Sequence, residues 1–258
     1  MLRFAANITM MFNEFEFLDR FEQAAAAGFK GVEMLFPYDV PAGEIAGKLA
    51  DYNLESVILN LPPGDFEAGD RGTAALPGRE KDFEEALDLA LSYTDTLGTR
   101  TLHIMAGIMD PENEAAMRTF EANLNKACDK ANGRDLTILV EPINQRGMPG
   151  YFLSDFTIAA DLVKRLDRSN LRLQFDVYHR QIIHGDIVMG LREHAPIIGH
   201  VQIANVPDRH EPPEGEIDYD FVFQELVNLE YQGWIGCEYF PKAGTVDGLG
   251  WFAPWRSS

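Results

Sequence analysis

Short apolar runs alternate with longer amphipathic segments along the whole chain. Several of the eight short runs are rich in Val, Ile and Leu, which is typical of parallel strands covered on both faces. They span residues 3–7, 31–35, 56–60, 101–105, 137–141, 171–176, 200–203 and 234–238. Apolar residues recur at helical spacing between them, as at Phe15, Leu18 and Phe21, and Gly28 follows as a stop signal. The pattern predicts eight strands that alternate with helices.

This alternation favours one fold. Eight strand–helix units without an intervening linker predict a closed (β/α)8 barrel. The 258 residues of the chain match the roughly 250 residues typical of that fold. We therefore expect residues 1–258 to form one barrel domain. A doubly wound open sheet is the alternative, but no glycine-rich phosphate loop follows the first strand.

The charge of the chain limits its partners. The formal net charge of −19 repels phosphate groups, so we expect neither nucleic acid nor an anionic membrane as a partner. The two cysteines, Cys128 and Cys237, are too few for a disulfide framework and suit a reducing compartment. The N-terminal segment lacks the pattern of a signal peptide, and no apolar run approaches the roughly 20 residues that span a bilayer. These features predict a cytoplasmic protein.

Oxygen-bearing side chains stand at or near the ends of the last four predicted strands. They are Glu141, Asp176, Gln202 and Glu238. Catalytic residues of (β/α)8 barrels lie at the carboxyl ends of the strands, so we expect these four to converge. Three carboxylates that converge repel one another unless a cation lies between them. An oxygen-only set suits Mg²⁺ or Mn²⁺ better than Zn²⁺, so we predict a divalent metal site there.

Longer motifs around these residues resemble a known family. They are LVEPIN (139–144), PGYFL (149–153), LQFDVYHRQ (173–181), HVQIANVPDRHEPPEGEIDY (200–219) and GCEYFP (236–241). Together with FAANITMMFNE near the start and GFKGVEMLFPYD, they are similar to the hydroxypyruvate isomerase family. That family belongs to the xylose isomerase-like barrels, which also include sugar 3-epimerases and endonuclease IV. The resemblance covers nearly the whole chain.

The resemblance implies roles for particular residues. Glu141, Asp176, Gln202 and Glu238 match the metal-binding positions, and Glu141 and Glu238 also match the paired acid/base glutamates. His179 matches the histidine of an Asp-x-x-His motif that faces the substrate. Sugar 3-epimerases typically have His where this chain has Gln202, which favours the hydroxypyruvate isomerase branch. Some members of that branch are similar to 2-oxo-tetronate isomerases, and both substrates stay open.

The expected chemistry is an aldose–ketose type isomerisation. One glutamate takes a proton from a hydroxylated carbon beside a carbonyl, and a second group returns a proton to the neighbouring carbon through an enediolate. The metal stabilises the developing charge as a Lewis acid, and no other cofactor is required. Hydroxypyruvate would give tartronate semialdehyde, and 2-oxo-tetronate would give 3-oxo-tetronate. The alternatives are a ketose 3-epimerase and a non-catalytic barrel that only binds a ligand.

A small anionic hydroxy-keto acid needs a cationic group in this acidic chain. Arginine suits a carboxylate because its fork binds two oxygens, and the candidates are Arg71, Arg180 and Arg209, with Arg209 preferred because it follows a ligand strand. His103 is a further candidate for the pocket wall. The Gly- and Pro-rich segment 61–78 carries Arg71 and is predicted to be a mobile lid. A homo-oligomer remains open, since the aromatic C-terminal segment could cover a subunit contact.

Overall fold

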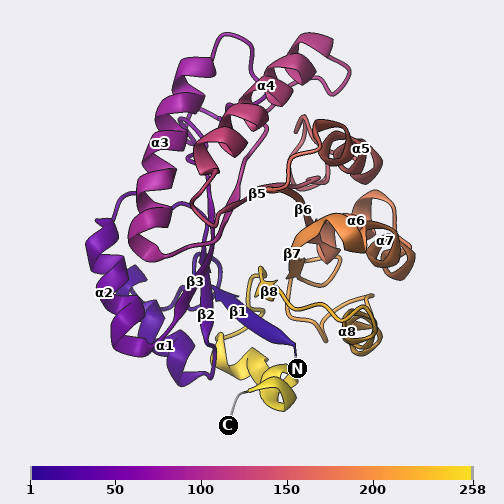
Figure 1. Ribbon diagram of the computed structural model, residues 1–258. Coiled ribbons are helices and arrows are strands. Elements are labelled where there is room, and N and C mark those ends of the chain that lie inside the picture. Colours follow the sequence, from indigo (N-terminus) through magenta and orange to yellow (C-terminus); the bar gives the residue numbers. More distant parts are fainter. Residues whose placement is uncertain (1, 257–258) are drawn as a thin grey trace.

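Eight parallel strands form a closed barrel in the computed structural model, which describes residues 2–256. Each strand pairs with the next along the chain, and the last pairs with the first. Figure 1 shows the helices around the outside of this ring of strands. The strands are β1 (Arg3–Asn7), β2 (Gly31–Met34), β3 (Glu55–Asn60), β4 (Thr101–His103), β5 (Thr137–Val140), β6 (Leu171–Asp176), β7 (Ile198–Ile203) and β8 (Trp234–Cys237).

The helices connect successive strands and cover their outer faces. They are α1 (Arg20–Ala26), α2 (Ala42–Tyr52), α3 (Glu80–Leu97), α4 (Glu114–Ala131), α5 (Phe156–Leu166), α6 (Val177–Ile183), α7 (Ile187–His194) and α8 (Tyr219–Asn228). Local chemistry sets several of their ends. The Asn113 side chain accepts hydrogen bonds from the first backbone N–H groups of α4, and Asp155 does the same for α5. Gly98 ends α3 in the left-handed conformation, with φ 67°.

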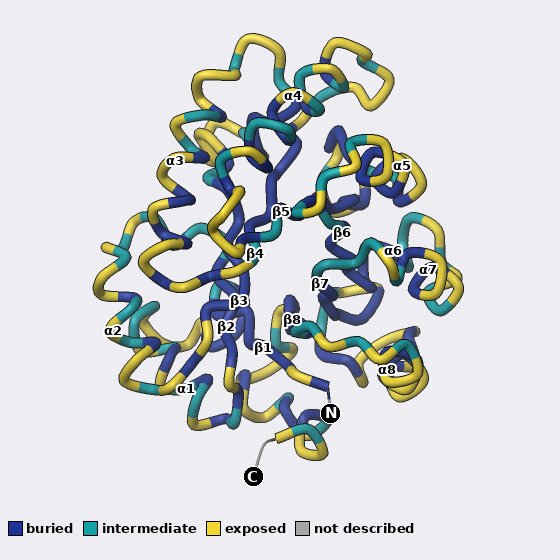
Figure 2. Tube along the Cα trace, in the orientation of Figure 1, coloured by how far each residue is buried: buried dark blue, intermediate teal, exposed yellow. Residues whose placement is uncertain are grey.

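Side chains alternate between the outside and the inside of the barrel along each strand. In β5, Ile138 and Val140 belong to the large apolar core between strands and helices. Leu139 instead packs with Ala5, Val57 and other inward residues in a small cluster inside the barrel. Figure 2 shows the strands as mostly buried, apart from residues where some of them begin, whereas the helices expose their outer faces. The alternation predicted from the sequence is therefore confirmed. Glu141 lies two residues after the inward-facing Leu139, so the same alternation directs it toward the barrel axis.

The (β/α)8 barrel predicted from the sequence is confirmed, and each strand lies within two residues of its expected bounds. The largest difference at the active end is β4, which stops at His103 rather than at residue 105. The chain closes on itself where the 3-10 segment η3 (Val246–Trp255) packs on β1, with Phe252 and Trp255 around Phe4. No helix within residues 2–256 has both the length and the apolar character needed to cross a membrane.

Candidate active site

Four strand ends bring the predicted oxygen-bearing residues to one end of the barrel. The register pairs Asp176 of β6 with Gln202 of β7, and Gln202 with Gly236 of β8. Glu141 follows β5 directly and Glu238 follows β8 directly. All four side chains are buried. The parallel barrel thus gathers residues that lie up to about a hundred positions apart in the sequence.

A cavity of about 400 Å³ opens above this group. Its polar wall contains His103, Glu141, His179, Arg209 and Glu238. Its apolar wall comes from the loops that follow the strands and from the first turn of α6, and includes Phe36, Phe66, Met105, Ile143, Met148, Tyr178 and Phe240. The volume lies at the lower end of the range typical of small-molecule sites, so the cavity suits a small polar ligand.

Glu141 is the most isolated of the acids. Its side chain is 5% exposed, and among the described residues its Oε1 atom has no hydrogen-bond partner. Two histidines lie beside it, with His103 Nδ1 at 3.7 Å from Oε2 and His179 Nε2 at 3.9 Å from Oε1. Burial raises the pKa of Glu141 well above its usual range, and the neighbouring Glu238 and Asp176 raise it further. A carboxyl of this kind is well suited to exchange a proton.

Asp176 ends β6 and begins α6. Its Oδ1 atom accepts a hydrogen bond from the Tyr178 backbone N–H at 2.7 Å, which fixes the carboxyl at the helix start. Its Oδ2 atom faces the site, 3.5 Å from His179 Nε2 and 3.3 Å from Arg209 Nη2. Burial raises the pKa of Asp176, although the Arg209 guanidinium opposes that shift. Oδ1 therefore caps the start of α6, whereas Oδ2 faces the candidate site.

Glu238 forms an ion pair with Arg209 across the cavity floor. The Arg209 Nη2 atom donates to both Glu238 Oε2 and Asp176 Oδ2, and its Nε atom donates to the Glu238 backbone oxygen at 3.2 Å. Arg209 has φ 60°, a left-handed conformation that is uncommon for a non-glycine residue. Burial raises the pKa of Glu238 to about 8, with a further increase from Asp176, even though Arg209 acts in the opposite direction.

Burial disfavours the charged form of both pocket histidines. Burial lowers the pKa of His103 to about 3, and it also holds the pKa of His179 well below its usual range, with Arg209 adding to the effect. Asn144 fixes the His179 ring, because its Nδ2 atom lies 2.6 Å and its backbone nitrogen 3.2 Å from His179 Nδ1. His179 Nε2 is thereby directed toward Glu141 and Asp176.

The geometry is compatible with a divalent cation. Glu141, Asp176 and His179 each offer a ligand atom, and these three atoms lie within 4.8 Å of one another. The unpaired Oε1 atom of Glu141 is a buried acceptor that a cation would satisfy. The other two expected ligands make contacts of their own: Glu238 pairs with Arg209, and the Gln202 amide bonds to Gln174 and Glu33. His179, expected as a substrate contact, thus also stands among the possible ligands.

The predicted substrate contacts do not all reach the cavity. His103, His179 and Arg209 line it, but Arg71 does not. The Arg71 guanidinium stacks on Phe66 at 3.7 Å and donates to the backbone oxygens of Phe66 and Asp70. Arg180 also points elsewhere, since its Nε atom donates to the Gly185 backbone oxygen. The positions of Arg71 and Arg180 in the sequence placed them near the site, but they did not predict the direction of either side chain.

The segment 61–78 reaches the cavity through Phe66. The later part of the segment is anchored, because Thr73, Ala74 and Ala75 are buried and Gly72 forms a β-bridge with Ala106. A side chain on Gly72 would collide with the backbone of Met105, and its φ of 112° also requires glycine. The movement of the segment 61–78, whose exposed part is residues 64–69, stays a prediction.

A buried residue that the sequence reasoning missed is Glu33. It lies on β2 inside the barrel, with no exposed surface, and contacts His200 and Gln202. The available signal was a charged residue at an inward position of the apolar strand GVEM. The Oε1 atom of Glu33 lies 2.5 Å from His200 Nε2, and His200, two residues before Gln202 on β7, is a paired histidine deeper in the barrel.

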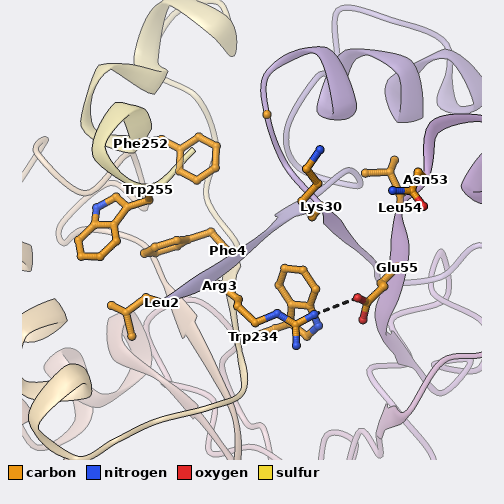
Figure 3. A pocket seen from close by; sticks show the side chains of 11 residues that line it. Leu2, Arg3, Phe4, Lys30, Asn53, Leu54, Glu55, Trp234, Phe252 and Trp255 are labelled. Atoms are coloured by element: carbon orange, nitrogen blue, oxygen red, sulfur yellow. Dashed lines mark hydrogen bonds and ion pairs between the residues drawn. The ribbon is translucent and has the colours of Figure 1, made fainter. Parts of the chain in front are cut away.

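A second cavity, of about 430 Å³, lies at the opposite end of the barrel. Figure 3 shows Arg3 and Glu55 joined by an ion pair, with Trp234 beneath Arg3 and Phe252 and Trp255 on the other side. Its charged groups are solvated, and it contains none of the strand-end acids. The chemistry therefore places the candidate site at the carboxyl ends of the strands.

Comparison with known proteins gives a consistent result. Residues 21–255 match the xylose isomerase-like TIM barrel family. A 2-oxo-tetronate isomerase of Cupriavidus necator is 48% identical over 257 residues, which is 99% of each chain. Hydroxypyruvate isomerase of Escherichia coli is 41% identical over 258 residues, 99% of this chain and 100% of that protein. A crystal structure described as AP endonuclease, family 2, from Brucella melitensis is 50% identical, with a TM-score of 0.98 and 100% coverage of both chains.

Proposed function

Because the chain belongs to the xylose isomerase-like TIM barrel family and is an isomerase, we propose that it isomerises a small hydroxy-keto acid with a divalent metal. The substrate is hydroxypyruvate, which gives tartronate semialdehyde, or 2-oxo-tetronate, which gives 3-oxo-tetronate. The observation that carries this proposal is the pair of buried glutamates, Glu141 and Glu238, on β5 and β8 at the floor of one cavity.

Glu141 and Glu238 are the proposed acid/base groups. A general base works best when its pKa lies near the operating pH, and burial raises both carboxyls toward that range. One glutamate takes the proton from the hydroxylated carbon, and the other supplies a proton to the neighbouring carbon. Because β5 and β8 are not adjacent in the barrel, the two groups can approach a flat enediolate from different sides.

Glu141, Asp176 and His179 would hold Mg²⁺ or Mn²⁺, with Glu238 and Gln202 as further ligands once their present contacts are exchanged. Such a cation supplies Lewis-acid polarisation of the substrate oxygens. Burial lowers the pKa of His103 to about 3 and holds the pKa of His179 well below its usual range, so both histidines favour the neutral form that can leave the carboxylate charge to the cation.

Arg209 is the proposed contact for the substrate carboxylate. It is the arginine that lines the cavity, and its guanidinium is held beside Tyr178, with 5.1 Å from its carbon to the ring centre. A small acid entering the cavity would meet this fork and leave its carbonyl end toward Glu141. The strongly acidic chain disfavours a DNA substrate, whatever description the similar Brucella melitensis structure carries.

The test is isotope exchange. Purified protein is incubated in D₂O with hydroxypyruvate, with 2-oxo-tetronate or with the neutral ketose fructose, each with Mn²⁺ or with EDTA. We expect deuterium at the carbon beside the carbonyl in one of the two acids, and loss of that exchange with EDTA. Exchange only in fructose would favour a ketose epimerase instead. Absence of exchange in both acids at full metal loading would contradict the proposal.

A separate experiment tests whether Arg209 contacts the substrate carboxylate. Arg209→Ala should raise KM for the acid substrate by roughly tenfold or more, since a charge-assisted contact is lost. Arg71→Ala is the matched control, because the Arg71 side chain lies in the loop near the cavity but does not line it. Equal effects of the two substitutions would remove Arg209 from the substrate site.

A further inference from the structure

A layer of buried polar side chains lies inside the barrel beneath the candidate site. It contains Asn7 of β1, Glu33 of β2, Gln174 of β6, and His200 and Gln202 of β7, each at most 1% exposed. Barrel interiors are ordinarily filled by branched apolar residues, so a carboxyl at this depth requires a reason. Both Glu33 and Gln174 follow directly on a register shift in their strands, a feature that often re-aims a side chain beside an active site.

Glu33 is the centre of this layer. Its Oε1 atom lies 2.5 Å from His200 Nε2, and its Oε2 atom accepts from Gln202 Nε2 at 3.0 Å and from Asn7 Nδ2 at 3.3 Å. Strand β8 leaves room for the carboxylate, because any side chain on Gly236 would collide with it. Three strands besides β2, namely β1, β7 and β8, therefore surround this carboxylate.

We infer that Glu33 is a positioning residue that makes Gln202 a metal ligand. A carboxylate offers only acceptors, so it fixes the amide nitrogen of Gln202 on its own side. The Gln202 oxygen must then point the other way, toward β6, where it lies 2.6 Å from Gln174 Nε2. The β6 partner of Gln202 in the register is Asp176, one of the three clustered metal-ligating groups.

The orientation of this amide decides its chemistry. Mg²⁺ and Mn²⁺ bind an amide through its oxygen, whereas an NH₂ group directed at the cation would repel it. Without Glu33, nothing would distinguish the two orientations of the Gln202 amide, and either its oxygen or its nitrogen could face the cation. This inference rests on the proposed metal dependence, but it concerns Gln202 and Glu33 rather than the catalytic glutamates.

Metal affinity is the direct readout. Mn²⁺ binding is measured by calorimetry on the wild type, Glu33→Gln and Glu33→Asp, without substrate. Loss of such an outer partner typically weakens metal binding by about 10- to 100-fold, and we expect this for Glu33→Gln, whose amide no longer selects one orientation of Gln202. Glu33→Asp keeps the charge but moves it away from Gln202, so its Mn²⁺ affinity should lie between that of the wild type and that of Glu33→Gln. It also provides a test if Glu33→Gln does not fold.

Glu225→Gln is the matched control. Glu225 is also a buried glutamate with two hydrogen bonds, but these go to Arg192 at the outer side of the barrel. It should leave Mn²⁺ affinity unchanged while reporting the general effect of removing a buried carboxylate. Wild-type affinity for Mn²⁺ in Glu33→Gln and Glu33→Asp would overturn the inference. A wild type that binds no Mn²⁺ would instead contradict the proposed function.

A double-mutant cycle establishes whether Glu33 acts through Gln202. Gln202→Ala should weaken Mn²⁺ binding by itself, because it removes a ligand. If Glu33 works by orienting that ligand, Glu33→Gln should add less than about a twofold change in the Gln202→Ala background. A full 10-fold effect of Glu33→Gln in that background would mean that Glu33 acts on the metal independently of Gln202, and the inference would be wrong.

Discussion

The barrel carries one arginine–glutamate pair at each end, and the two pairs differ in burial. At the end where the strands begin, Arg3 pairs with Glu55 at 2.9 Å, with side chains 46% and 64% exposed. At the end where the strands finish, Arg209 pairs with Glu238, with side chains 23% and 8% exposed. The same two residue types therefore occur in water at one end and inside the protein at the other.

Burial changes what such a pair can do. Water screens the charges of Arg3 and Glu55, and exposed ion pairs contribute little to stability. Arg209 and Glu238 are not screened in this way, and Asp176 and Glu141 add like charges beside them. The buried end therefore carries pKa values displaced toward neutrality, which is typical of a functional site. The exposed end has a cavity of similar size but ordinary surface chemistry.

The largest expected effect comes from removing one proton-accepting oxygen at the buried end. Glu141→Gln and Glu238→Gln keep the side-chain shape and an oxygen, but they abolish proton transfer at that position. Each should lower kcat by about 10²-fold or more, the usual contribution of a positioned acid or base. The measurement is steady-state turnover of hydroxypyruvate and 2-oxo-tetronate at saturating Mn²⁺.

Glu55→Gln makes the same chemical change at the exposed end and serves as the control, with kcat within about twofold of the wild type. Isotope exchange separates the two buried glutamates: the variant that loses both exchange and turnover has lost the group that abstracts the proton. Near-normal turnover in both buried variants would leave Glu141 and Glu238 as structural residues only.

The barrel and the meeting of the strand-end acids were predictable from the sequence. The short apolar runs and the helical spacing between them predicted a (β/α)8 barrel and the order of its strands and helices along the chain. In such a barrel, residues that end successive strands must meet, so Glu141, Asp176 and Glu238 were identified without coordinates. Gln202, near the end of the seventh predicted strand, followed from the same argument, and the resemblance of the surrounding motifs added the expected activity.

Side-chain direction outside the strands was not predictable. The sequence places Arg71 in a loop near the site, but the aromatic ring of Phe66 and two backbone oxygens hold it in its own loop. It also predicts no partner for Glu33, because that requires knowing that β2 and β7 face each other across the barrel. Contacts across a closed barrel depend on its register and tilt, which a single strand does not encode.

The second prediction concerns pH and sharpens the comparison of the two pairs. Burial raises the pKa of Glu238 to about 8, so the folded protein holds this proton more tightly than the unfolded chain, with its usual value of 4.5. The loss of folding stability caused by ionising the buried Glu238 is absent below about pH 4.5, grows between pH 4.5 and 8, and is complete above that. Without metal, Glu238→Gln should therefore gain stability relative to the wild type as pH rises from 5 to 8, by up to ~1.4 kcal/mol per pH unit.

Denaturant unfolding of both proteins in EDTA at several pH values measures this difference. The comparison with the wild type is needed because acids elsewhere, such as Asp70 beside Arg79, have lowered pKa values and contribute with the opposite sign. Added Mn²⁺ should reverse the trend for the wild type, because the metal binds deprotonated carboxylates. A stability difference that does not change with pH would mean that Glu238 titrates like an exposed acid.

The smallest expected effect lies at the exposed end of the barrel. Arg3 contacts both Glu55 and the face of Trp234, 3.9 Å from the ring centre, so Glu55→Gln removes the ion pair but leaves the stacking in place. Because both charged groups stand in water, the free energy of unfolding should change by no more than about 1 kcal/mol, and the change should shrink further in high salt. Arg3→Ala should cost more than Glu55→Gln, since it also uncovers Trp234. Denaturant unfolding at low and high salt tests both statements. If Glu55→Gln destabilised the protein by several kcal/mol irrespective of salt, the two ends would not differ in the way their exposure indicates, and burial alone would not explain why only one of them holds reactive acids.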